Sequence, residues 1–218
     1  MEKIITIDGL ASSGKSTLSQ KLSEKLNWPW FSTGVLYRGM AYVGLREDFT
    51  EKEYLSFFKS KEWSIQLTHL QSLFFYKGRD ISSHLYQEDI DEQASRFSAH
   101  PSYRKALISV QRAFYKPQSG KGLILEGRDC GSILFPSAPL KIFLTAQDNM
   151  RAKRRAEDRK KTTQVIFQSQ KNRDQRDQQR SFAPLIRPQG AICLNSGKYS
   201  SSQLLDIVYE QAQNIFSV

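Results

Sequence analysis

Short apolar runs bounded by polar residues mark the expected buried strands of this chain. Ile4-Ile5-Thr6-Ile7 leads into Asp8-Gly9, and similar runs cover residues 123–126, 140–144 and 191–194. Continuous apolar runs of this length are typical of strands that are buried on both faces. Such strands belong to the parallel sheet of an α/β domain, so we expect that fold class.

Helical periodicity fills most of the segments between these runs. Leu18, Leu22 and Leu26 recur at helical spacing, and Pro101 suits the first turn of a later helix. Further helical patterns cover residues 33–43, 87–98, 102–115 and 204–212. The chain has no internal repeat and no low-complexity linker, so we expect a single domain over residues 1–218.

Residues 63–77 follow a different pattern. Trp63-Ser64-Ile65-Gln66-Leu67 alternates between apolar and polar residues, and Leu73-Phe74-Phe75-Tyr76 leads into the turn sequence Lys77-Gly78-Arg79-Asp80. Parallel strands of an α/β core would be separated by helices, which are missing here. We therefore expect a small antiparallel insertion at about residues 60–86, whose aromatic side chains form its own core.

The composition excludes several classes of protein. The 218 residues are 39% hydrophobic and 11% aromatic, which suits a folded core and not a disordered chain. No apolar run approaches the roughly 18–20 residues that a membrane span needs. Met1-Glu2-Lys3 leads into the first apolar run without the apolar stretch of a signal peptide. We therefore expect a cytoplasmic protein that does not act on membranes.

The cysteines and histidines give no sign of a disulfide or a metal site. Cys130 and Cys193 lie far apart and in no C-x-x-C pattern, as in reduced intracellular proteins. His69, His84 and His100 lack the spacing of metal ligands.

The net charge of +10 is concentrated in one segment. Residues 151–180 contain 11 basic and four acidic side chains, so they carry +7. A solvated helix face is one interpretation of such a segment. Single-stranded nucleic acid is another, but it would require interleaved aromatic residues, and the aromatic residues here are only Phe167 within the segment and Phe182 just after it. The third is a basic, mobile element that meets a phosphate-rich small molecule.

A phosphate-binding motif follows the first apolar run. The sequence fits G-x-x-x-x-G-K-[ST] and lies between an expected strand and an expected helix. Gly9 and Gly14 allow a close backbone approach, Lys15 can reach the β- and γ-phosphates of ATP, and the Ser16 hydroxyl can bind Mg²⁺. The expected ATP-binding residues are Gly9, Leu10, Ala11, Ser12, Ser13, Gly14, Lys15, Ser16 and Thr17.

Other motifs narrow the class of nucleotide-binding protein. The N-K-x-D signature of GTPases is missing. Leu123-Ile124-Leu125-Glu126 comes close to the apolar run and acid of an ATPase motor, so the Glu126 carboxylate is a further candidate. The alternative is a small kinase, in which a second substrate binds at the insertion and a basic lid closes over the phosphoryl group.

Five blocks of sequence, spread over nearly the whole chain, together resemble one family. They are Ile7-Asp8-Gly9 with Gly14-Lys15-Ser16-Thr17, Thr33-Gly34-Val35-Leu36-Tyr37-Arg38, Ala94-Ser95 with Pro101, Arg104 and Gln111-Arg112, Glu126-Gly127-Arg128-Asp129-Cys130-Gly131, and Arg173-Asp174-x-x-Asp177-x-x-Arg180 before Ala183-Pro184-Leu185. In this order they resemble the bacterial cytidylate (CMP) kinases. The resemblance implies a three-layer P-loop kinase fold with a central five-stranded parallel sheet, a CMP-binding antiparallel insertion and a helical lid at about residues 150–172.

The resemblance also implies roles for individual residues. Lys15, Arg128, Arg173 and Arg180 would be catalytic, because they hold the transferring phosphoryl group. The CMP-binding residues would be Thr33, Arg38, Ser95, Arg104, Arg128, Asp129, Arg173, Asp177 and Arg180, with Ser95, Arg104 and Asp129 at the cytosine and Asp177 with Arg173 at the pentose. Helical spacing puts Arg173, Asp177 and Arg180 on one helix face. Arg154 and Arg155 are candidates for arginines that the lid delivers.

Three positions depart from the family pattern. Leu10, Ala11 and Ser12 stand where the family usually has P-S-G, which leaves fewer flexible positions in the loop. Leu85-Tyr86 replaces Ile-Arg and removes one cation near the acceptor phosphate. Asn195-Ser196 replaces Asp-Thr near the last strand, where the adenine end of ATP is expected. These departures concern affinity and nucleotide preference more than the class of reaction.

The implied reaction transfers the γ-phosphoryl group of ATP to CMP or dCMP, with Mg²⁺ as cofactor. The acceptor phosphate is already anionic near neutral pH, so no general base is expected. We expect a monomer whose partners are these small molecules and not nucleic acid. The alternatives are a P-loop kinase acting on UMP, AMP or a non-nucleotide alcohol, and a nucleic-acid-binding protein.

Overall fold

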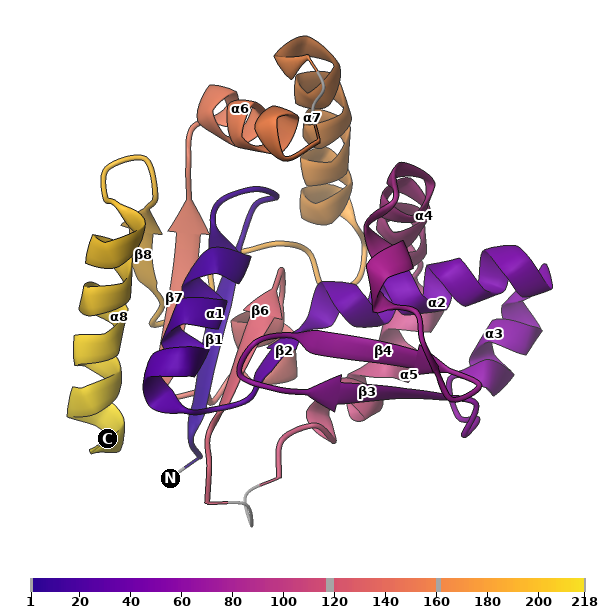
Figure 1. Ribbon diagram of the computed structural model, residues 1–218, viewed down its shortest axis with the longest axis horizontal. Helices are drawn as coiled ribbons and strands as arrows, with labels where there is room; N and C mark the ends of the chain where they lie inside the picture. Colours follow the sequence, from indigo (N-terminus) through magenta and orange to yellow (C-terminus); the bar gives the residue numbers. More distant parts are fainter. Residues whose placement is uncertain (1, 117–119, 160–161, 218) are drawn as a thin grey trace.

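A parallel five-stranded sheet lies at the centre of the computed structural model, which describes residues 2–116, 120–159 and 162–217 (Figure 1). The strand order is β2-β6-β1-β7-β8. The strands are β1 (Ile4–Gly9), β2 (Trp30–Ser32), β6 (Leu123–Gly127), β7 (Leu140–Thr145) and β8 (Ile192–Asn195). The expected α/β class and the five parallel strands are confirmed.

Helices cover both faces of this sheet. The helices in the described part of the chain are α1 (Lys15–Leu26), α2 (Thr33–Glu47), α3 (Glu51–Phe57), α4 (Glu88–Ala99), α5 (Pro101–Arg112), α6 (Asp148–Arg159), α7 (Thr163–Gln179) and α8 (Ser201–Phe216), with the short helical segments η1 (Ser82–Tyr86) and η3 (Cys130–Leu134). In the part of the chain that the structure describes, no helix is both long and apolar enough to cross a membrane.

Side-chain alternation along β1 explains the two covered faces. Ile4 packs into the core beneath α2 and α5, whereas Ile5 and Ile7 pack beneath α1 and α8. Successive strand residues point to opposite faces, so a strand covered on both sides needs apolar residues at consecutive positions. This is why β1 reads as a continuous apolar run and not as an alternating one.

The antiparallel insertion is present as expected. It consists of β3 (Trp63–Leu67), β4 (Ser72–Tyr76) and the short β5 (Arg79–Asp80). Phe74 is fully buried against α2, where a Cβ on Gly39 would lie 2.2 Å from its ring. Ser72 Oγ donates to the carbonyl oxygen of Trp30 at 2.9 Å, which joins the insertion to β2 of the main sheet.

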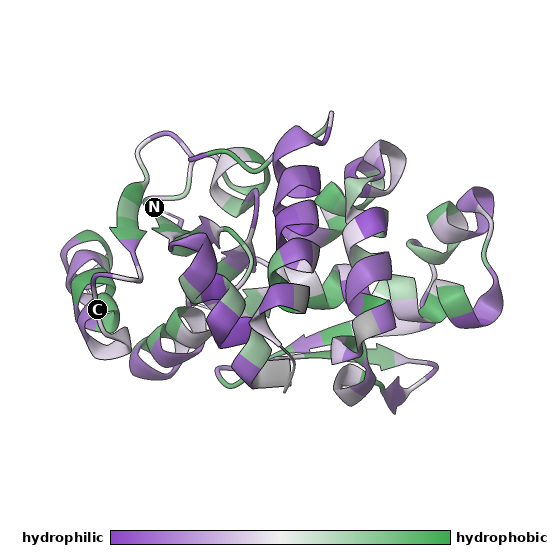
Figure 2. Cartoon of the chain, turned by 90° about the horizontal axis from the view of Figure 1, so that it is seen from above, coloured by the Kyte–Doolittle hydropathy of each residue, from purple (hydrophilic) through white to green (hydrophobic). Residues whose placement is uncertain are grey.

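Two helices, α6 and α7, stand above the carboxyl ends of the strands (Figure 1). Their surfaces are mainly hydrophilic (Figure 2), and their mutual contact is the small apolar cluster of Ala152, Ala156 and Ile166. The expected basic helices are therefore confirmed. Residues 160 and 161 of the expected lid lie outside the described residues, and the division of the chain into domain, insertion and lid stays a prediction.

The structure adds short elements that the sequence pattern missed, among them the strand β2 and the helix α3. The strand β2 has three residues, too few for a hydrophobic pattern. The helix α3 has seven, but it begins with a capping box in which Thr50 and Glu53 bond reciprocally, and that signal could have identified it. The helix boundaries also differ, because α2 continues to Glu47 and α5 ends at Arg112 instead of residue 115.

Candidate functional site

The phosphate loop, residues 9–16, connects β1 to α1 as expected. A Cβ on Gly9 would lie 2.1 Å from the carbonyl oxygen of Leu144, and Gly14 has a φ of 93° just before α1. Glycine is therefore required at both ends of the loop. Ser12 also has a left-handed backbone, with φ 57°, where the family usually has glycine.

Side chains of α6 and α7 hold the middle of this loop. The Ala11 N–H donates to Asp174 Oδ1 at 3.2 Å. The Ala11 carbonyl oxygen accepts bonds from Arg151 Nη1 at 3.0 Å and from Gln170 Nε2 at 2.9 Å. Arg151 and Asp174 also pair with each other at 2.5 Å. The sequence analysis assigned no site role to Arg151, Asp174 or Gln170, because their contacts cross more than 130 residues.

Lys15 is buried inside the loop that it belongs to. Its Nζ donates to the Leu10 carbonyl oxygen at 2.6 Å. Burial, and then the nearby Arg128, lower the pKa of Lys15 well below its usual value. A bound phosphate would supply the missing negative charge and favour the ammonium form.

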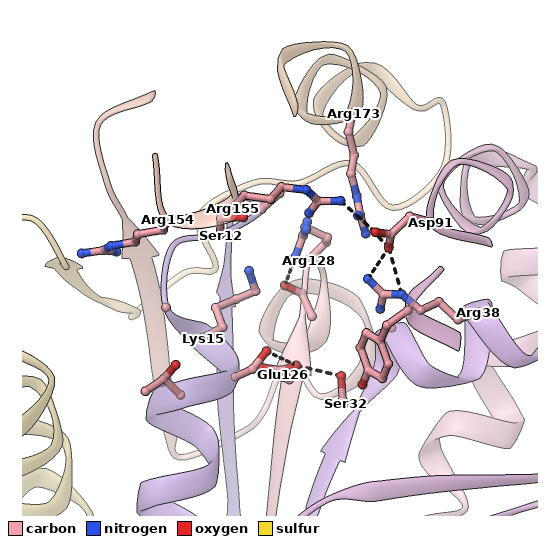
Figure 3. A pocket seen from close by; sticks show the side chains of 17 residues that line it. Ser12, Lys15, Ser32, Arg38, Asp91, Glu126, Arg128, Arg154, Arg155 and Arg173 are labelled. Carbon is pink, nitrogen blue, oxygen red and sulfur yellow. Dashed lines mark hydrogen bonds and ion pairs between the residues drawn. The ribbon is translucent and has the colours of Figure 1, made fainter. Parts of the chain in front are cut away.

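A cavity of about 570 Å³ opens between the phosphate loop, α2, α4 and the lid helices (Figure 3). Among the described residues, six cationic side chains and two carboxylates line it, which gives it a strongly positive character. The cations are Lys15, Arg38, Arg128, Arg154, Arg155 and Arg173, and the carboxylates are Asp91 and Glu126. These side chains come from five helices, α1, α2, α4, α6 and α7, and from the end of β6.

Glu126 lies at the bottom of this cavity, near the end of β6. Its Oε1 accepts bonds from the Ser16 hydroxyl at 2.9 Å and from the Ser32 hydroxyl at 2.7 Å. Its Oε2 is buried without a hydrogen-bond partner among the residues that the structure describes. A hydroxyl beside a carboxylate oxygen with unused capacity is a donor set that suits Mg²⁺.

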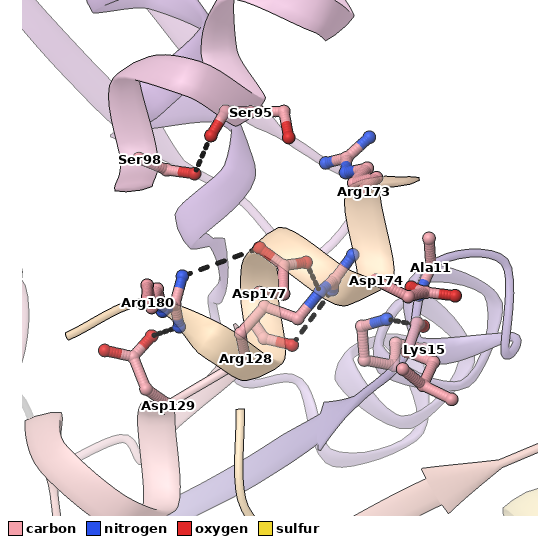
Figure 4. A network of polar contacts seen from close by, with 12 residues as sticks. Ala11, Lys15, Ser95, Ser98, Arg128, Asp129, Arg173, Asp174, Asp177 and Arg180 are labelled. Atoms are coloured by element: carbon pink, nitrogen blue, oxygen red, sulfur yellow. Dashed lines mark hydrogen bonds and ion pairs between the residues drawn. The ribbon is translucent and has the colours of Figure 1, made fainter. Parts of the chain in front are cut away.

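A second, smaller cavity of about 50 Å³ adjoins the first one. Buried ion pairs form its wall (Figure 4). Arg104 is hydrogen-bonded to Asp129, Arg128 Nε donates to Asp177 Oδ2 at 2.8 Å, and Arg180 lies 3.5 Å from Asp129 and 3.6 Å from Asp177. Five of the expected CMP-binding residues therefore share one network.

Charges within this network shift the pKa values of its members. Burial alone would raise the pKa of Asp177, but Arg128, Arg173 and Arg180 outweigh it and lower that pKa. Burial, and then the adjacent Arg38 and Arg128, lower the pKa of Arg173 well below its usual value. At Arg173, burial and the neighbouring cations thus outweigh the carboxylates, which favours an anionic ligand beside it.

The expected helix face is found with one change. Arg173 and Asp177 lie on α7, whereas Arg180 is the residue that ends this helix. Its guanidinium is also bonded to the Ala183 carbonyl oxygen. The A-P-L sequence therefore holds Arg180 in place just beyond the helix.

Thr33 and Ser95 occupy different kinds of position. The Thr33 hydroxyl donates to the Glu126 carbonyl oxygen at 2.9 Å, at the first residue of α2. Ser95 is buried on α4, and its hydroxyl has no hydrogen-bond partner within the described part of the chain. Its neighbours Ala94 and Ser98 line the smaller cavity, and Ser95 does not.

The two lid arginines point to different partners. Arg154 donates to the hydroxyl and the carbonyl oxygen of Ser196, at 2.9 and 2.8 Å. Arg155 donates to Asp91 Oδ2 at 2.9 Å. Arg155 is thus turned toward α4, and Arg154 toward the loop that follows β8.

The structure shows where the residues that depart from the family pattern after the insertion and after the last strand lie. Leu85 is fully buried in the core, and the ring of Tyr86 lies 5.1 Å from the guanidinium carbon of Arg38 at the cavity wall. Ser196 receives Arg154 as described, and the Asn195 side chain accepts the Gly197 N–H at 2.9 Å. A tyrosine therefore covers Arg38 where the family has a further cation.

Asp8 links the phosphate-loop strand to the turn after β6. It is fully buried, and its two carboxylate oxygens accept the N–H groups of Cys130 and Gly131 at 2.8 and 2.7 Å. Burial raises its pKa to about 6, although these two bonds act in the opposite direction. The turn that carries Arg128 and Asp129 is therefore attached directly to β1.

Comparisons with known proteins agree with this geometry. The family model for cytidylate kinase matches residues 5–214. The cytidylate kinase of Bdellovibrio bacteriovorus is 37% identical over 218 residues, covering 98% of this chain and 99% of that protein. The cytidylate kinase of Chlamydia muridarum is 37% identical over 209 residues, covering 93% and 94%. Among solved structures, an uncharacterized protein from Eubacterium ventriosum has a TM-score of 0.55 at 16% identity, covering 98% and 99% of the two chains, which shows a shared fold.

The family match spans almost the entire chain, and the phosphate loop and the arginine network lie within it. The curated relatives match over nearly their whole length as well. This chain therefore belongs to the cytidylate kinase family.

Proposed function

We propose that this protein transfers the γ-phosphoryl group of ATP to CMP or dCMP, giving ADP and the cytidine diphosphate. The observation that carries the proposal is the cavity of six cations between the phosphate loop and the Arg104–Asp129 pair. ATP and a nucleoside monophosphate together bring about six negative charges, since a phosphate monoester carries close to −2 at pH 7. Guanidinium groups suit phosphate oxygens because they can bind them in a bidentate way.

Catalysis then depends on positioning and charge. The acceptor oxygen is anionic near neutral pH, so no side chain has to remove a proton from it. Lys15, Arg128, Arg173 and Arg180 stabilise the negative charge on the transferring group and hold it in line with the acceptor. Lys15 leaves the Leu10 carbonyl when the phosphates arrive, because an anion is the stronger partner for an ammonium group.

Ser16 and Glu126 are the residues that would hold Mg²⁺. The buried Oε2 of Glu126 and the adjacent Ser16 hydroxyl support this assignment. When bound, the ion neutralises charge on the phosphates of ATP. In the sequence, Glu126 was a further candidate because it ends the apolar run Leu123-Ile124-Leu125, but no metal was assigned to it.

The acceptor nucleotide enters between α2, α4 and the end of β6. Arg38, Arg128, Arg173 and Arg180 bind its phosphate, and Asp177 with Arg173 binds the pentose. Thr33 is a further residue of the CMP-binding side. Ser95, Arg104 and Asp129 bind the cytosine, whose amino group donates and whose ring nitrogen and carbonyl accept. The small volume beside these residues means that the base-binding side opens when the nucleotide enters.

The lid excludes water from the transfer. Arg154 and Arg155 belong to α6, which also holds the phosphate loop through Arg151. Closure of this helix over the phosphates prevents water from acting as acceptor.

The test is an ADP-release assay with ATP and Mg²⁺ in which CMP, dCMP, UMP, AMP and GMP are compared as acceptors. We expect a strong preference for CMP and dCMP. Efficient use of another monophosphate would retain the kinase but contradict the roles of Ser95, Arg104 and Asp129. If no monophosphate stimulates ADP release, the proposed reaction is wrong.

A further inference from the structure

Asp91 is a buried carboxylate at the centre of the arginines, and neither the motif analysis nor the proposed reaction has given it a role. It lies in the first turn of α4 and is 5% exposed. Its Oδ1 accepts bonds from Arg38 Nε at 3.0 Å and Nη2 at 2.7 Å, and its Oδ2 accepts one from Arg155 Nη2 at 2.9 Å (Figure 3). Arg173 Nη1 lies 3.6 Å from Oδ1.

Asp91 fixes the orientation of Arg38. The carboxylate engages one edge of the guanidinium, formed by Nε and Nη2. The remaining nitrogen, Nη1, lies 2.8 Å from the place where a Cβ on Gly34 would be, so it faces the start of α2. The ring of Tyr86 lies against the same guanidinium. One edge of Arg38 is thus anchored while the other faces both cavities, which Gly34 also lines.

Asp91 also ties the lid to the acceptor side. Arg155 belongs to α6, and Arg38 and Asp91 belong to α2 and α4. The same helix α6 holds the phosphate loop through Arg151. A single carboxylate therefore links the acceptor-phosphate arginine to the helix that covers ATP.

Two roles are compatible with a carboxylate in this place, and the geometry distinguishes them. Asp91 could compete with the acceptor phosphate for the arginines, or it could hold them ready for that phosphate. A guanidinium has five donor N–H groups, and Asp91 engages Arg38 through the edge formed by Nε and Nη2, so that Nη1 of Arg38 still faces the cavities. Three arginines around one carboxylate keep an excess of positive charge for a dianion.

We infer that Asp91 is a positioning residue for the transfer reaction: it orients Arg38 toward the acceptor phosphate and fastens the lid arginine Arg155 to the acceptor side. This inference rests on the proposed function. It implies that loss of the carboxylate weakens acceptor binding and loosens the lid, while the phosphate loop keeps its own contacts with ATP.

The test compares Asp91→Asn, Asp91→Ala and Asp91→Glu with the wild-type chain. Steady-state assays give kcat and the KM values for CMP and ATP, and ADP release without CMP measures hydrolysis by water. For Asp91→Asn we expect the KM for CMP to rise about tenfold, and more for Asp91→Ala, because a charged hydrogen bond to Arg38 is lost. The KM for ATP should stay within about twofold, the ratio of hydrolysis to transfer should increase, and Asp91→Glu should recover part of the CMP affinity.

Glu92→Gln is the matched control. Glu92 is the next residue on α4, and it pairs with Arg176 and Arg96 outside both phosphate cavities. Like Asp91→Asn, Glu92→Gln removes one negative charge from α4, but we expect its KM for CMP to be unchanged. If Asp91→Ala does not fold, Asp91→Asn still tests the inference, because it keeps the shape of the side chain. Calorimetric titration of Asp91→Asn with CMP then gives the affinity as a second measurement.

Three results would overturn the inference. A lower KM for CMP in Asp91→Asn would mean that the carboxylate competes with the acceptor. Equal KM values in Asp91→Asn and Glu92→Gln would mean that Asp91 has no effect beyond its charge. A parallel rise in the KM for ATP would mean that Asp91 supports the fold of the whole site. In contrast, a wild-type chain without CMP-dependent transfer would contradict the proposed function itself.

Discussion

The donor side and the acceptor side of this site recognise phosphate in different ways. On the donor side, the phosphate loop presents backbone N–H groups from one continuous segment, and two glycines allow its path. On the acceptor side, the recognising groups are arginine side chains from four elements, and each is paired with a carboxylate: Arg38 with Asp91, Arg104 with Asp129, Arg128 with Asp177, and Arg180 with both Asp129 and Asp177.

The two sides therefore need different contacts to keep their anion-binding groups in place before the phosphate binds. The backbone donors of the loop lie in one segment, and the distant side chains of Arg151, Gln170 and Asp174 brace that segment at Ala11. Arginines brought together from separate elements repel one another, and buried carboxylates are required to hold them. The phosphate-binding groups of the donor side are therefore neighbours in the sequence, whereas those of the acceptor side are brought together only by the tertiary fold.

The largest effect is expected for Lys15→Ala, which removes the only ammonium group of the donor loop. Transfer should fall by at least about 10³-fold, because no other group replaces this cation at the transferring phosphoryl group. CMP binding, measured by calorimetry, should stay within about threefold, since Lys15 belongs to the donor side. A variant that keeps more than a tenth of the activity would contradict this role.

The free energy of unfolding is expected to depend on pH through Asp8, which connects the strand before the donor loop to the turn after β6. Its pKa is raised from 3.8 to about 6 by burial, so between these values the folded chain retains a proton that the unfolded chain has lost. The contribution of Asp8 to the free energy of unfolding therefore falls as pH rises from about 4 to 6, by about 3 kcal/mol.

Urea denaturation of the wild type and of Asp8→Asn at several pH values checks this expectation. The variant cannot titrate at this position, so the wild type should lose stability relative to it over that interval. Two stability curves that run parallel from pH 4 to 7 would show that Asp8 has an ordinary pKa.

A selective loss is expected for Asp129→Ala. The change leaves Arg104 and Arg180 without their shared carboxylate, so the KM for CMP should rise about 10- to 100-fold. Binding of ATP should change by less than about twofold because the phosphate loop does not contact this pair. Asp129→Asn, which keeps the side-chain shape, separates the loss of charge from a loss of packing. Near-normal turnover of CMP would exclude Asp129 from acceptor recognition.

The smallest effect is expected for Ser12→Gly on the donor side. Glycine removes a left-handed strain of about 1–2 kcal/mol, but it also adds entropy to the unfolded chain. The free energy of unfolding should change by less than about 1 kcal/mol, with kcat unchanged. Thermal unfolding and steady-state kinetics measure both quantities, with Ser12→Ala as the control. A tenfold loss of kcat in both variants would instead assign a function to the Ser12 hydroxyl.

The sequence predicted the local parts of the molecule well. The strands β1, β6, β7 and β8, the phosphate loop and the antiparallel insertion all carry their signal within a few consecutive residues. The three-residue β2 was missed because its pairing with β6 comes from a segment about 90 residues away. The helix α3 was missed although its capping box was readable at Thr50 and Glu53.

The sequence alone determined the class of the fold, the donor loop and the family, because glycine spacing, apolar runs and ordered motifs are properties of neighbouring residues. Only the tertiary structure decided which carboxylate meets which arginine. Asp91 looks like an ordinary helix-surface acid in the sequence, and Asp174 belongs to a family motif without an assigned role, yet both are buried partners of distant arginines. The physical reason is that an ion pair between elements far apart in the chain depends on how these elements pack, and no local pattern records that packing.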